Sequence, residues 1–516
     1  MKNICIIALL FFSLSSCSSF LEEYSQDLSR VETVSDLDEL LLGGVYHNSG
    51  YIYIANFMYH TEGSEGLNLF INFMSDELQQ NTETGYGDLY SESVFGYYTW
   101  QRDVGITLQG NSVGTEDTDW NLMYQYINAA NMIIYELPEV EATNEDDAAD
   151  KIRIEGEAHF LRALYYFTLV NLYAEPYAPS TAATTPGIPL KNTSYIEDKE
   201  YTRNTVAEVY KQILSDLDRA EECLSQTERK SLYRADITAT YLLKSRVYLY
   251  MQDWENARTY AQNVLDRNSS LTNLNSFNGE DNVFTSSSPE AIFSMGGHFL
   301  SYYIYGYDDY EDETPFFISN DLVEAFDEEN DLRKGIYITE TPYGWLYKKI
   351  YWAKEHYGVA CSVSDNYFFR TSEAYLNLAE AAAMDNDEAT AIQMLTELRA
   401  RRFTSAPAIS ASGTALIDLI RKERQRELCL EGHRWYDLRR YTVCEEYPWS
   451  KSFQHTFTEF NYSINYSETS RVRVYELEEY DKAYTLAFPR EVRDFQNTLA
   501  TNERPERQPI YTSENQ

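Results

Sequence analysis

Apolar residues recur every three or four positions in several long segments, which is the spacing of an amphipathic helix. The first segment begins near Trp120, where Thr118 or Asp119 could cap a helix. Its inner face would carry Trp120, Met123, Tyr124, Ile127, Asn131 and Ile134. Further helices are predicted over 147–173, 206–224, 236–250, from Trp254 onward, 369–384 and 387–401. Alanines at the expected crossings are typical of tetratricopeptide-type pairs, although no strict period of about 34 residues is visible.

Long tracts between these helices lack helical periodicity. Residues 271–320 and 341–368 are rich in tyrosine and tryptophan, and 441–480 is expected to be a third loop-rich excursion. A short strand is predicted at Ala291–Ser294. Long loops commonly carry the residues that bind a ligand. We therefore expect a helical scaffold and a separate loop-rich face for the ligand. Helical pairs would form a scaffold over about 118–268 and 369–440, and a loop-rich ligand face would span about 45–117, 271–368 and 441–480.

The chain begins with Met1 and Lys2, followed by an apolar run over Ile4–Leu14 and the triplet Ser15-Ser16-Cys17. The run is shorter than the about 20 residues that span a bilayer. A basic start, a short apolar core and small residues before the cut are typical of a secretory signal. We therefore expect residues 1–16 to be a lipoprotein signal peptide and 17–516 the mature chain, with lipid attached to Cys17. An ordinary signal peptide with an incidental cysteine is the alternative.

Acidic residues outnumber basic ones by 82 to 42, which gives a formal net charge of −40. This charge repels nucleic acid and polyanionic sugars unless a basic patch intervenes. Tyrosine is abundant, with 45 residues, and its apolar ring with a polar tip suits wet recognition surfaces. The cysteines of the mature chain other than Cys17 are widely spaced and are expected to be small buried residues, with a disulfide left open: Cys223, Cys361, Cys429 and Cys444.

Residues 420–441 are predicted to be the charged end of a helix that stops at Gly432, followed by an aromatic-basic segment. Glutamates recur there every four residues and would share one helix face. Because like charges repel, arginines must neutralise them, and the nearest candidates are Arg424, Arg426, Arg434 and Arg439. We interpret the segment as a structural charge network of Glu423, Arg424, Glu427, Glu431 and Arg434. The alternative is the carboxylate pair of a glycosidase, which would have to face a cleft.

Other catalytic patterns are weak. Gly110-Asn-Ser-Val-Gly114 matches the nucleophile-elbow pattern but lacks the preceding strand and the helix at the serine that this motif requires. The seven histidines are scattered, and no nucleotide-binding motif is present. The acidic runs 308–313 and 327–331 could bind a hard cation but lack the spacing of a calcium loop. We expect no catalytic residue, no metal and no cofactor.

The string Glu-Arg-Gln-Arg-Glu-Leu-Cys-Leu-Glu-Gly-His-Arg-Trp-Tyr-Asp-Leu-Arg-Arg-Tyr, ending at Tyr441, resembles the C-terminal signature of the RagB/SusD family. This family comprises surface glycan- or nutrient-binding lipoproteins of Bacteroidetes. Further segments resemble the family in the same order along the chain: Cys17 to Glu22, Trp120 to Asn131, Gly156 to Phe167 with Leu172-Tyr173 and Pro176-Tyr177, Phe369 to Glu380, and Ala487 to Val492.

The resemblance implies a SusD-like, mainly α fold in which tetratricopeptide-type helical pairs carry long loop-rich insertions and few short strands. It also implies a lipid-anchored protein of the outer membrane, exposed at the cell surface. Such a protein captures oligosaccharide and passes it to a SusC-like TonB-dependent transporter, with no catalysis. Because some relatives take peptides, a peptide ligand is the alternative.

Ligand contacts are predicted from environment, since the family has no fixed binding motif. A sugar ring offers C–H faces that stack on Trp or Tyr, and its hydroxyls pair with polar groups at the rim. An individual aromatic residue is nevertheless more often part of the core. The candidates that lie in loop-like, polar surroundings are Trp100, Tyr305, Tyr307 and Trp345.

Overall fold

The computed structural model describes residues 31–47, 67, 70–82, 88–195, 197, 199–279, 282–295, 300–304, 314–350, 362–463, 466–496 and 498–514. Long helices dominate it, and the expected mainly α fold class is confirmed. The expected helices appear as α5 (Thr115–Glu136), α6 (Glu145–Tyr173), α7 (Val206–Leu224), α8 (Ile237–Met251), α9 (Trp254–Arg267), α13 (Thr371–Met384) and α14 (Glu388–Arg399).

Polar caps explain where most of these helices begin. Thr205 accepts a hydrogen bond from the Glu208 amide while the Glu208 side chain accepts from the Thr205 amide, a capping box that starts α7. Asp236 and Asp387 cap α8 and α14 with their carboxylates. Helix α5 differs from the expectation, because it begins one turn earlier, after Gly114 in the left-handed region, and has no side-chain cap.

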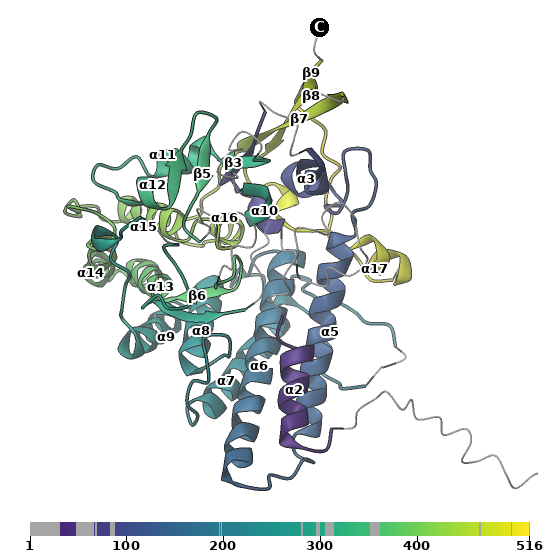
Figure 1. Ribbon diagram of the computed structural model, residues 1–516. Coiled ribbons are helices and arrows are strands. Elements are labelled where there is room, and N and C mark those ends of the chain that lie inside the picture. The colour runs from purple at the N-terminus through teal and green to yellow at the C-terminus, as the bar shows by residue number, and fades with distance from the viewer. Residues whose placement is uncertain are drawn as a thin grey trace, which may run out of the picture.

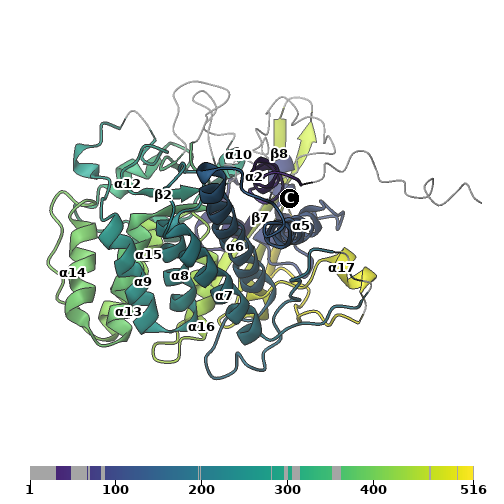
Figure 2. The ribbon, with the colours of Figure 1, turned by 90° about the horizontal axis from the view of Figure 1, so that it is seen from below.

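Successive helices pack side by side. Helix α6 packs against α7, α8 against α9, and α13 against both α9 and α14, so that a row of helices crosses the molecule (Figures 1 and 2). The alanines predicted at the crossings, Ala257 and Ala261, are fully buried. Small side chains there let the helix axes approach closely, as helical pairs require. Helix α2 (Val34–Gly44) lies beside α5 and α6.

The closest approach between α6 and α7 occurs at Gly156. A Cβ atom there would lie 2.7 Å from Leu224 Cγ and 2.9 Å from Cys223 Cβ. We expect Gly156→Ala to lower the free energy of unfolding by about 1–3 kcal/mol through overpacking. In Gly43→Ala, within α2, the added methyl meets nothing within 4 Å, so helix propensity should raise stability by up to about 1 kcal/mol. Urea unfolding of both variants tests this, and equal shifts would contradict the crossing argument.

Among the described residues, the strands form three antiparallel sheets. One has the order β1 (Leu78–Gln80), β3 (Phe316–Ile318), β5 (Trp345–Tyr347), β4 (Ile338–Glu340). A second pairs β2 (Ala291–Ser294), which is the predicted strand, with β6 (Phe368–Arg370). The third joins β7 (Phe453–Ser463), β8 (Tyr466–Leu477) and β9 (Tyr511–Glu514).

The long β7–β8 hairpin corrects the expectation of a loop-rich excursion over 441–480. Phe453, His455 and Phe457 point to one buried face, so the segment does alternate as a strand should. The signal was obscured because the middle position of that buried face is a histidine. The hairpin projects at the top of the view in Figure 1, near the C-terminus.

The other described helices are α3 (Asp88–Ser93), α4 (Phe95–Tyr98), α10 (Ser301–Ile304), α11 (Asn320–Ala325), α12 (Arg333–Ile336), α15 (Thr414–Glu427), α16 (Arg434–Thr442) and α17 (Arg490–Phe495), with 3-10 turns η2 (Phe70–Met74), η3 (Leu274–Ser276) and η5 (Lys482–Tyr484). Within the described ranges, no helix has the length and apolar character needed to cross a membrane.

Candidate functional site

The charged segment around residue 427 folds differently from the expected single helix. Helix α15 ends at Glu427, with Leu428 as its C-cap. Leu430 and Gly432 then take positive φ angles of 58° and 76°, and α16 begins at Arg434. The prediction that the helix continues to Gly432 is therefore wrong, because the chain turns at Leu430. Glu431 lies in this turn and not on the helix face that carries Glu423 and Glu427.

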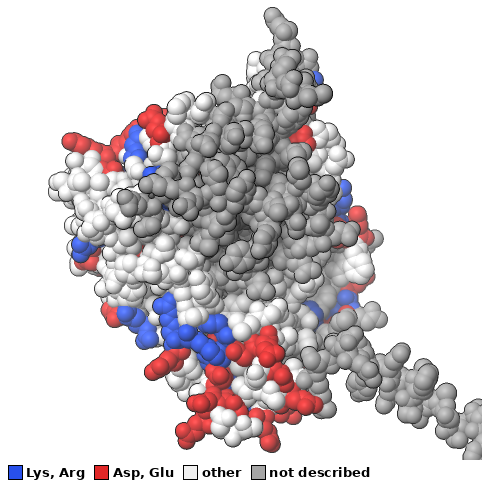
Figure 3. All heavy atoms as spheres, in the orientation of Figure 1, with Lys and Arg blue, Asp and Glu red and all other residues white. Residues whose placement is uncertain are grey.

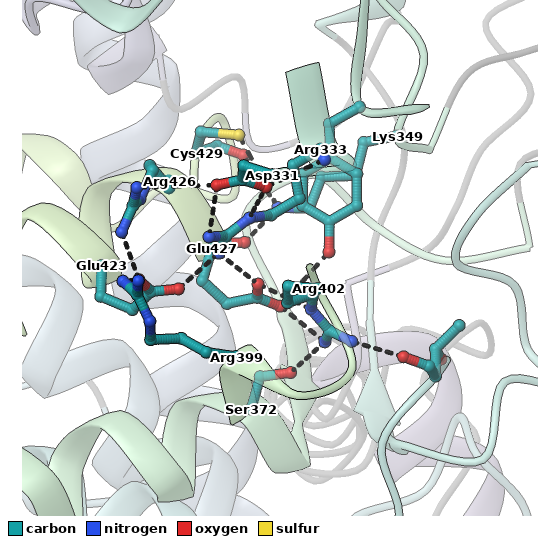
Figure 4. A network of polar contacts seen from close by, with 12 residues as sticks. Asp331, Arg333, Lys349, Ser372, Arg399, Arg402, Glu423, Arg426, Glu427 and Cys429 are labelled. Atoms are coloured by element: carbon teal, nitrogen blue, oxygen red, sulfur yellow. Dashed lines mark hydrogen bonds and ion pairs between the residues drawn. The ribbon is translucent and has the colours of Figure 1, made fainter. Parts of the chain in front are cut away.

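Glu427 is the centre of a buried cluster of guanidinium groups (Figure 4). Arg402 holds both carboxylate oxygens, with Nε 2.9 Å from Oε2 and Nη2 2.8 Å from Oε1. Arg370 donates to Oε1 at 2.6 Å and Arg333 to Oε2 at 3.1 Å. All four side chains are fully shielded from solvent. A carboxylate held by three guanidiniums is a strong, charge-assisted junction between distant segments.

The neighbouring glutamates have similar partners. Glu423 accepts from Arg333 at 2.7 Å and from Arg399 at 3.1 Å, and it also pairs with Arg426. Glu431 is held in a two-pronged contact by Arg370, at 2.8 and 2.9 Å. Apart from Arg426, the arginines that neutralise these carboxylates come from other parts of the chain.

Three of the arginines expected to neutralise the glutamates bind elsewhere. Arg424 contacts Asp437 through Nε, at 2.8 Å to the nearer oxygen, and Arg434 holds Asp76 in a two-pronged contact at 2.7 and 2.8 Å. Arg439 donates to backbone carbonyls. Sequence proximity misled the assignment, because the turn after α15 carries Arg434 and Arg439 away from the glutamate face. Arg333, Arg370, Arg399 and Arg402 were missed, and no local signal identifies them.

The electrostatics of the cluster favour ionised carboxylates. Burial alone would raise the pKa of Glu427, but Arg402 and Arg370 lower it well below its ordinary value. Burial likewise opposes ionisation of Glu423, and Arg333 and Arg426 lower its pKa to about 2. A general acid needs a raised pKa and access to substrate. Glu423 and Glu427 have neither, so their arrangement joins chain segments and does not form an accessible carboxylate pair.

The acidic run 327–331 belongs to the same cluster. Glu328 pairs with Arg399 and Arg426, and Asp331 pairs with Arg333 at 2.8 Å. The run 308–313 lies outside the described residues. Among the residues that the structure describes, no group of His, Cys, Asp and Glu is arranged to hold a metal ion.

Trp100 is part of the core. Its side chain is fully buried, its indole N–H donates to the Met74 carbonyl at 2.9 Å, and its ring stacks on His455 with centroids 4.4 Å apart. A ring without an exposed face cannot stack on a sugar, so the prediction of a ligand contact at Trp100 is wrong. Its polar neighbours in sequence suggested a loop at the surface, but strand β7 covers the ring with Phe453 and His455.

Trp345 has a more open environment. It lies on β5, is only partly buried, and has the Lys334 ammonium 5.2 Å from its ring centroid. Tyr343, in the preceding turn, is 49% exposed and was not among the four predicted ligand residues. Its only sequence signal is its place before Gly344, whose missing Cβ lets the turn pack on the Phe317 ring. Tyr305 and Tyr307 lie outside the described residues.

The remaining candidates from the sequence are the cysteines and Ser112. Cys223, Cys429 and Cys444 are buried free thiols, as expected for small core residues; Cys17 and Cys361 lie outside the described residues. Ser112 is exposed, its hydroxyl accepts from the Gly114 amide at 3.2 Å, and it forms an isolated bridge with Ile106. Within the described part of the chain, no strand directly precedes this tight loop, and α5 begins at Thr115 and not at the serine, as a nucleophile elbow requires.

Acidic side chains gather at the end of the molecule opposite the β7–β8 hairpin, beside a smaller basic group (Figure 3). Exposed residues of the α5–α6 connection and the first turn of α6 contribute to the acidic group: Glu139, Glu141, Glu145 and Asp146. Strand β5, which begins at Trp345, lies well away from this acidic group, on the side where the strands and short helices meet (Figure 1).

The molecule combines a row of paired helices with a face of short sheets, and a buried glutamate–arginine junction joins its segments. These features define a class of helical-scaffold proteins. Residues 62–249 match the profile of the family described as "Starch-binding associating with outer membrane", and residues 318–514 match that of the "SusD family". The chain belongs to the SusD/RagB family.

Relatives and solved structures extend this likeness along most of the chain. SusD-like protein P25 of Formosa agariphila is 25% identical over 507 residues, covering 86% of this chain and 90% of its own. The structure titled as a putative sugar binding protein from Bacteroides vulgatus has a TM-score of 0.67 at 22% identity, covering 92% of this chain and 99% of its own. A SusD superfamily protein from Bacteroides thetaiotaomicron has a TM-score of 0.66 at 22% identity, covering 92% and 100%.

Proposed function

We propose that the protein is a cell-surface carbohydrate-binding lipoprotein of the outer membrane, anchored through Cys17. It would capture oligosaccharide and pass it to a SusC-like TonB-dependent transporter without catalysing a reaction. The observation that carries the proposal is the shared fold, over 92% of the chain, with a structure titled as a putative sugar binding protein. A second neighbour, titled as a SusD-like carbohydrate binding protein, shares the fold over 91% of the chain at a TM-score of 0.65.

The proposed ligand platform is the β4–β5 hairpin. The half-exposed Tyr343 ring and the partly exposed Trp345 ring can stack on the C–H faces of sugar rings. The Lys334 ammonium next to Trp345 pairs with Asp327, and its further N–H groups can donate hydrogen bonds to sugar hydroxyls. Tyr305 and Tyr307 remain proposed contributors. Binding of this kind needs no metal and no cofactor.

The test is calorimetry of the purified mature protein against neutral oligosaccharides and, separately, a peptide pool. Saturable heat with a saccharide supports the proposal, whereas heat with peptides alone would assign the scaffold to peptide capture. Chromatography of the saccharide after incubation should recover it uncleaved. For the anchor, Cys17→Ser should move the protein from the membrane fraction to the soluble fraction of the envelope.

Removal of the platform aromatics should weaken binding. We expect Tyr343→Ala and Trp345→Ala each to raise the Kd for the bound oligosaccharide about 3- to 10-fold, because each stacking contact contributes about 1 kcal/mol. Tyr135→Ala is the matched control, since Tyr135 is 64% exposed on α5, away from the hairpin. An unchanged Kd in both hairpin variants would remove the platform from the proposal.

A further inference from the structure

A groove lies on the other side of the molecule, between α5, α17 and the segment around Pro189. It encloses about 660 Å³, within the range of small-molecule sites, about 300–1,000 Å³. Helix α17 lies beside the first half of α5 and on the opposite side of the molecule from α12, the helix that precedes the β4–β5 hairpin (Figures 1 and 2). The groove is therefore separate from the platform of Tyr343 and Trp345.

The wall of the groove is a rigid aromatic surface. Trp120 packs against Tyr124, Tyr173 and Phe488, with ring centroids 4.9, 4.8 and 5.0 Å away. Tyr124 is held in turn by its hydroxyl, which donates to the Pro189 carbonyl at 2.8 Å. Among the described residues, the indole N–H of Trp120 has no hydrogen-bond partner. A fixed aromatic wall is pre-organised for a ligand with apolar faces.

Two further rings border the groove. Tyr201 is anchored through its hydroxyl, which donates to Glu197 at 3.0 Å, and Lys199 lies 4.8 Å from its ring centroid. Phe495, at the end of α17, is 89% exposed. A phenyl ring left in water at the mouth of a groove is available for stacking, and its burial by a ligand would be favourable.

Polar groups at the rim decide the ligand class. The exposed Asn121 and Asp494 contribute an amide and a carboxylate. The Lys191 ammonium is already engaged, donating to the Thr193 carbonyl and hydroxyl at 2.9 Å and to the Tyr195 carbonyl at 2.7 Å. Among the described residues that line the groove, the rim therefore offers acceptors for hydroxyl donors, and the ammonium of its lysine is engaged, which disfavours an anionic ligand.

We propose that this groove is a second saccharide-binding site, which takes the rings of a neutral oligosaccharide. The ligand class rests on the proposed function, but the location does not depend on the hairpin platform. Sugar C–H faces would lie on Phe495, against a floor formed by Trp120, which is 6% exposed, and hydroxyls would donate to Asp494 and Asn121. Two sites on one chain would increase the retention of a long glycan, because the second contact is made at high effective concentration.

The test uses the tryptophan indole N–H signals of the full mature protein, which has seven tryptophans. Trp120→Phe assigns the Trp120 signal. Maltoheptaose, cellohexaose and xylohexaose are the neutral probes, with a heparin oligosaccharide as the anionic probe and a peptide pool as the alternative ligand. We expect at least one neutral probe to shift the Trp120 signal saturably, and the heparin probe to leave it in place.

Variants show which residues contribute to the binding that shifts the Trp120 signal. Phe495→Ala and Asp494→Ala change exposed residues and should raise the Kd read from the Trp120 signal about 3- to 10-fold. Tyr135→Ala, on the same helix about 20 Å from Trp120, should leave it unchanged, as should the double variant Tyr343→Ala, Trp345→Ala. A Phe495→Ala protein with wild-type affinity at Trp120 would overturn the assignment.

The outcomes separate the two proposals. In one outcome, calorimetry shows heat with a saccharide, the heat disappears in the hairpin variant, and the Trp120 signal does not shift. This outcome would overturn the second site and leave the proposed function standing. A Trp120 shift with peptides only would overturn the ligand class of the groove. No heat and no shift with any saccharide would overturn both.

Discussion

Replacing Glu427 by glutamine is expected to lower the free energy of unfolding by about 3–5 kcal/mol. The variant keeps the shape of the side chain but removes the negative charge on which Arg333, Arg370 and Arg402 converge. Three guanidiniums would then share a dry site without that compensating charge, and burial of uncompensated charge is costly. Urea unfolding followed by circular dichroism measures the loss, together with a lower yield of folded protein.

Glu139→Gln is the matched control for this prediction. Glu139 is exposed, and the same loss of charge there should change stability by less than about 1 kcal/mol. A catalytic role for Glu427 predicts the reverse pattern, with wild-type unfolding and loss of a hydrolytic activity. That pattern would remove the structural interpretation of the cluster.

Raising the pH from about 6.5 to 8 is expected to destabilise the wild-type protein through Glu77. This residue lies between η2 and β1, is fully buried, and accepts the Leu430 amide at 3.3 Å. Burial, reinforced by the adjacent Asp76 carboxylate, raises the pKa of Glu77 from its ordinary 4.5 to about 8. Asp76 itself is held ionised: burial opposes this, but Arg434 and Lys451 lower its pKa.

The sign follows from proton counting. Between about pH 4.5 and 8 the folded state keeps the Glu77 proton and the unfolded state has lost it, so stability falls as pH rises through this window. Above about pH 8 both states are ionised and this contribution is constant. Burial lowers the pKa of His47 and of His455 to about 4, so their contribution to stability changes mainly below about pH 7. The histidines are the same in a Glu77 variant, so the difference between the variant and the wild type isolates Glu77 from them.

Glu77→Gln is the variant that measures this effect. It cannot ionise, and its amide oxygen can still accept the Leu430 amide. We expect its stability relative to wild type to rise by roughly 2 kcal/mol between pH 6.5 and pH 8. Urea midpoints at four or five pH values give the difference directly. Parallel pH profiles for the two proteins would show that Glu77 is already ionised in the folded state.

Local signals in the sequence were sufficient for much of the scaffold. The range predicted for α7 and for β2 is the observed one, because each begins and ends at signals within a few residues: the Thr205–Glu208 capping box for α7, and a short apolar run for β2. Errors arose where tertiary contacts override such signals. The turn at Leu430 ends α15 before Gly432, and the core-facing His455 conceals the alternation of β7.

The functional residues were harder to predict, because exposure is not encoded locally. Trp100 and Trp345 have similar polar neighbours in the sequence, yet the first is sealed by β7 and the second stays partly open on β5. Tyr343 and the groove beside Trp120 depend in the same way on which distant segments cover them. A side chain's accessible area is a property of the packed chain and not of its flanking residues.

Taken alone, the amino-acid sequence determined the helical class of this protein, the position of most scaffold helices and its family, because periodicity, caps and signature strings act over a few residues. Only the tertiary structure decided which charges pair and which rings remain exposed. Arg333 and Glu423 are 90 positions apart and Asp76 and Arg434 are 358 apart. Such partners meet only after the chain has folded, and Coulomb attraction then selects among all the charges brought within a few ångströms.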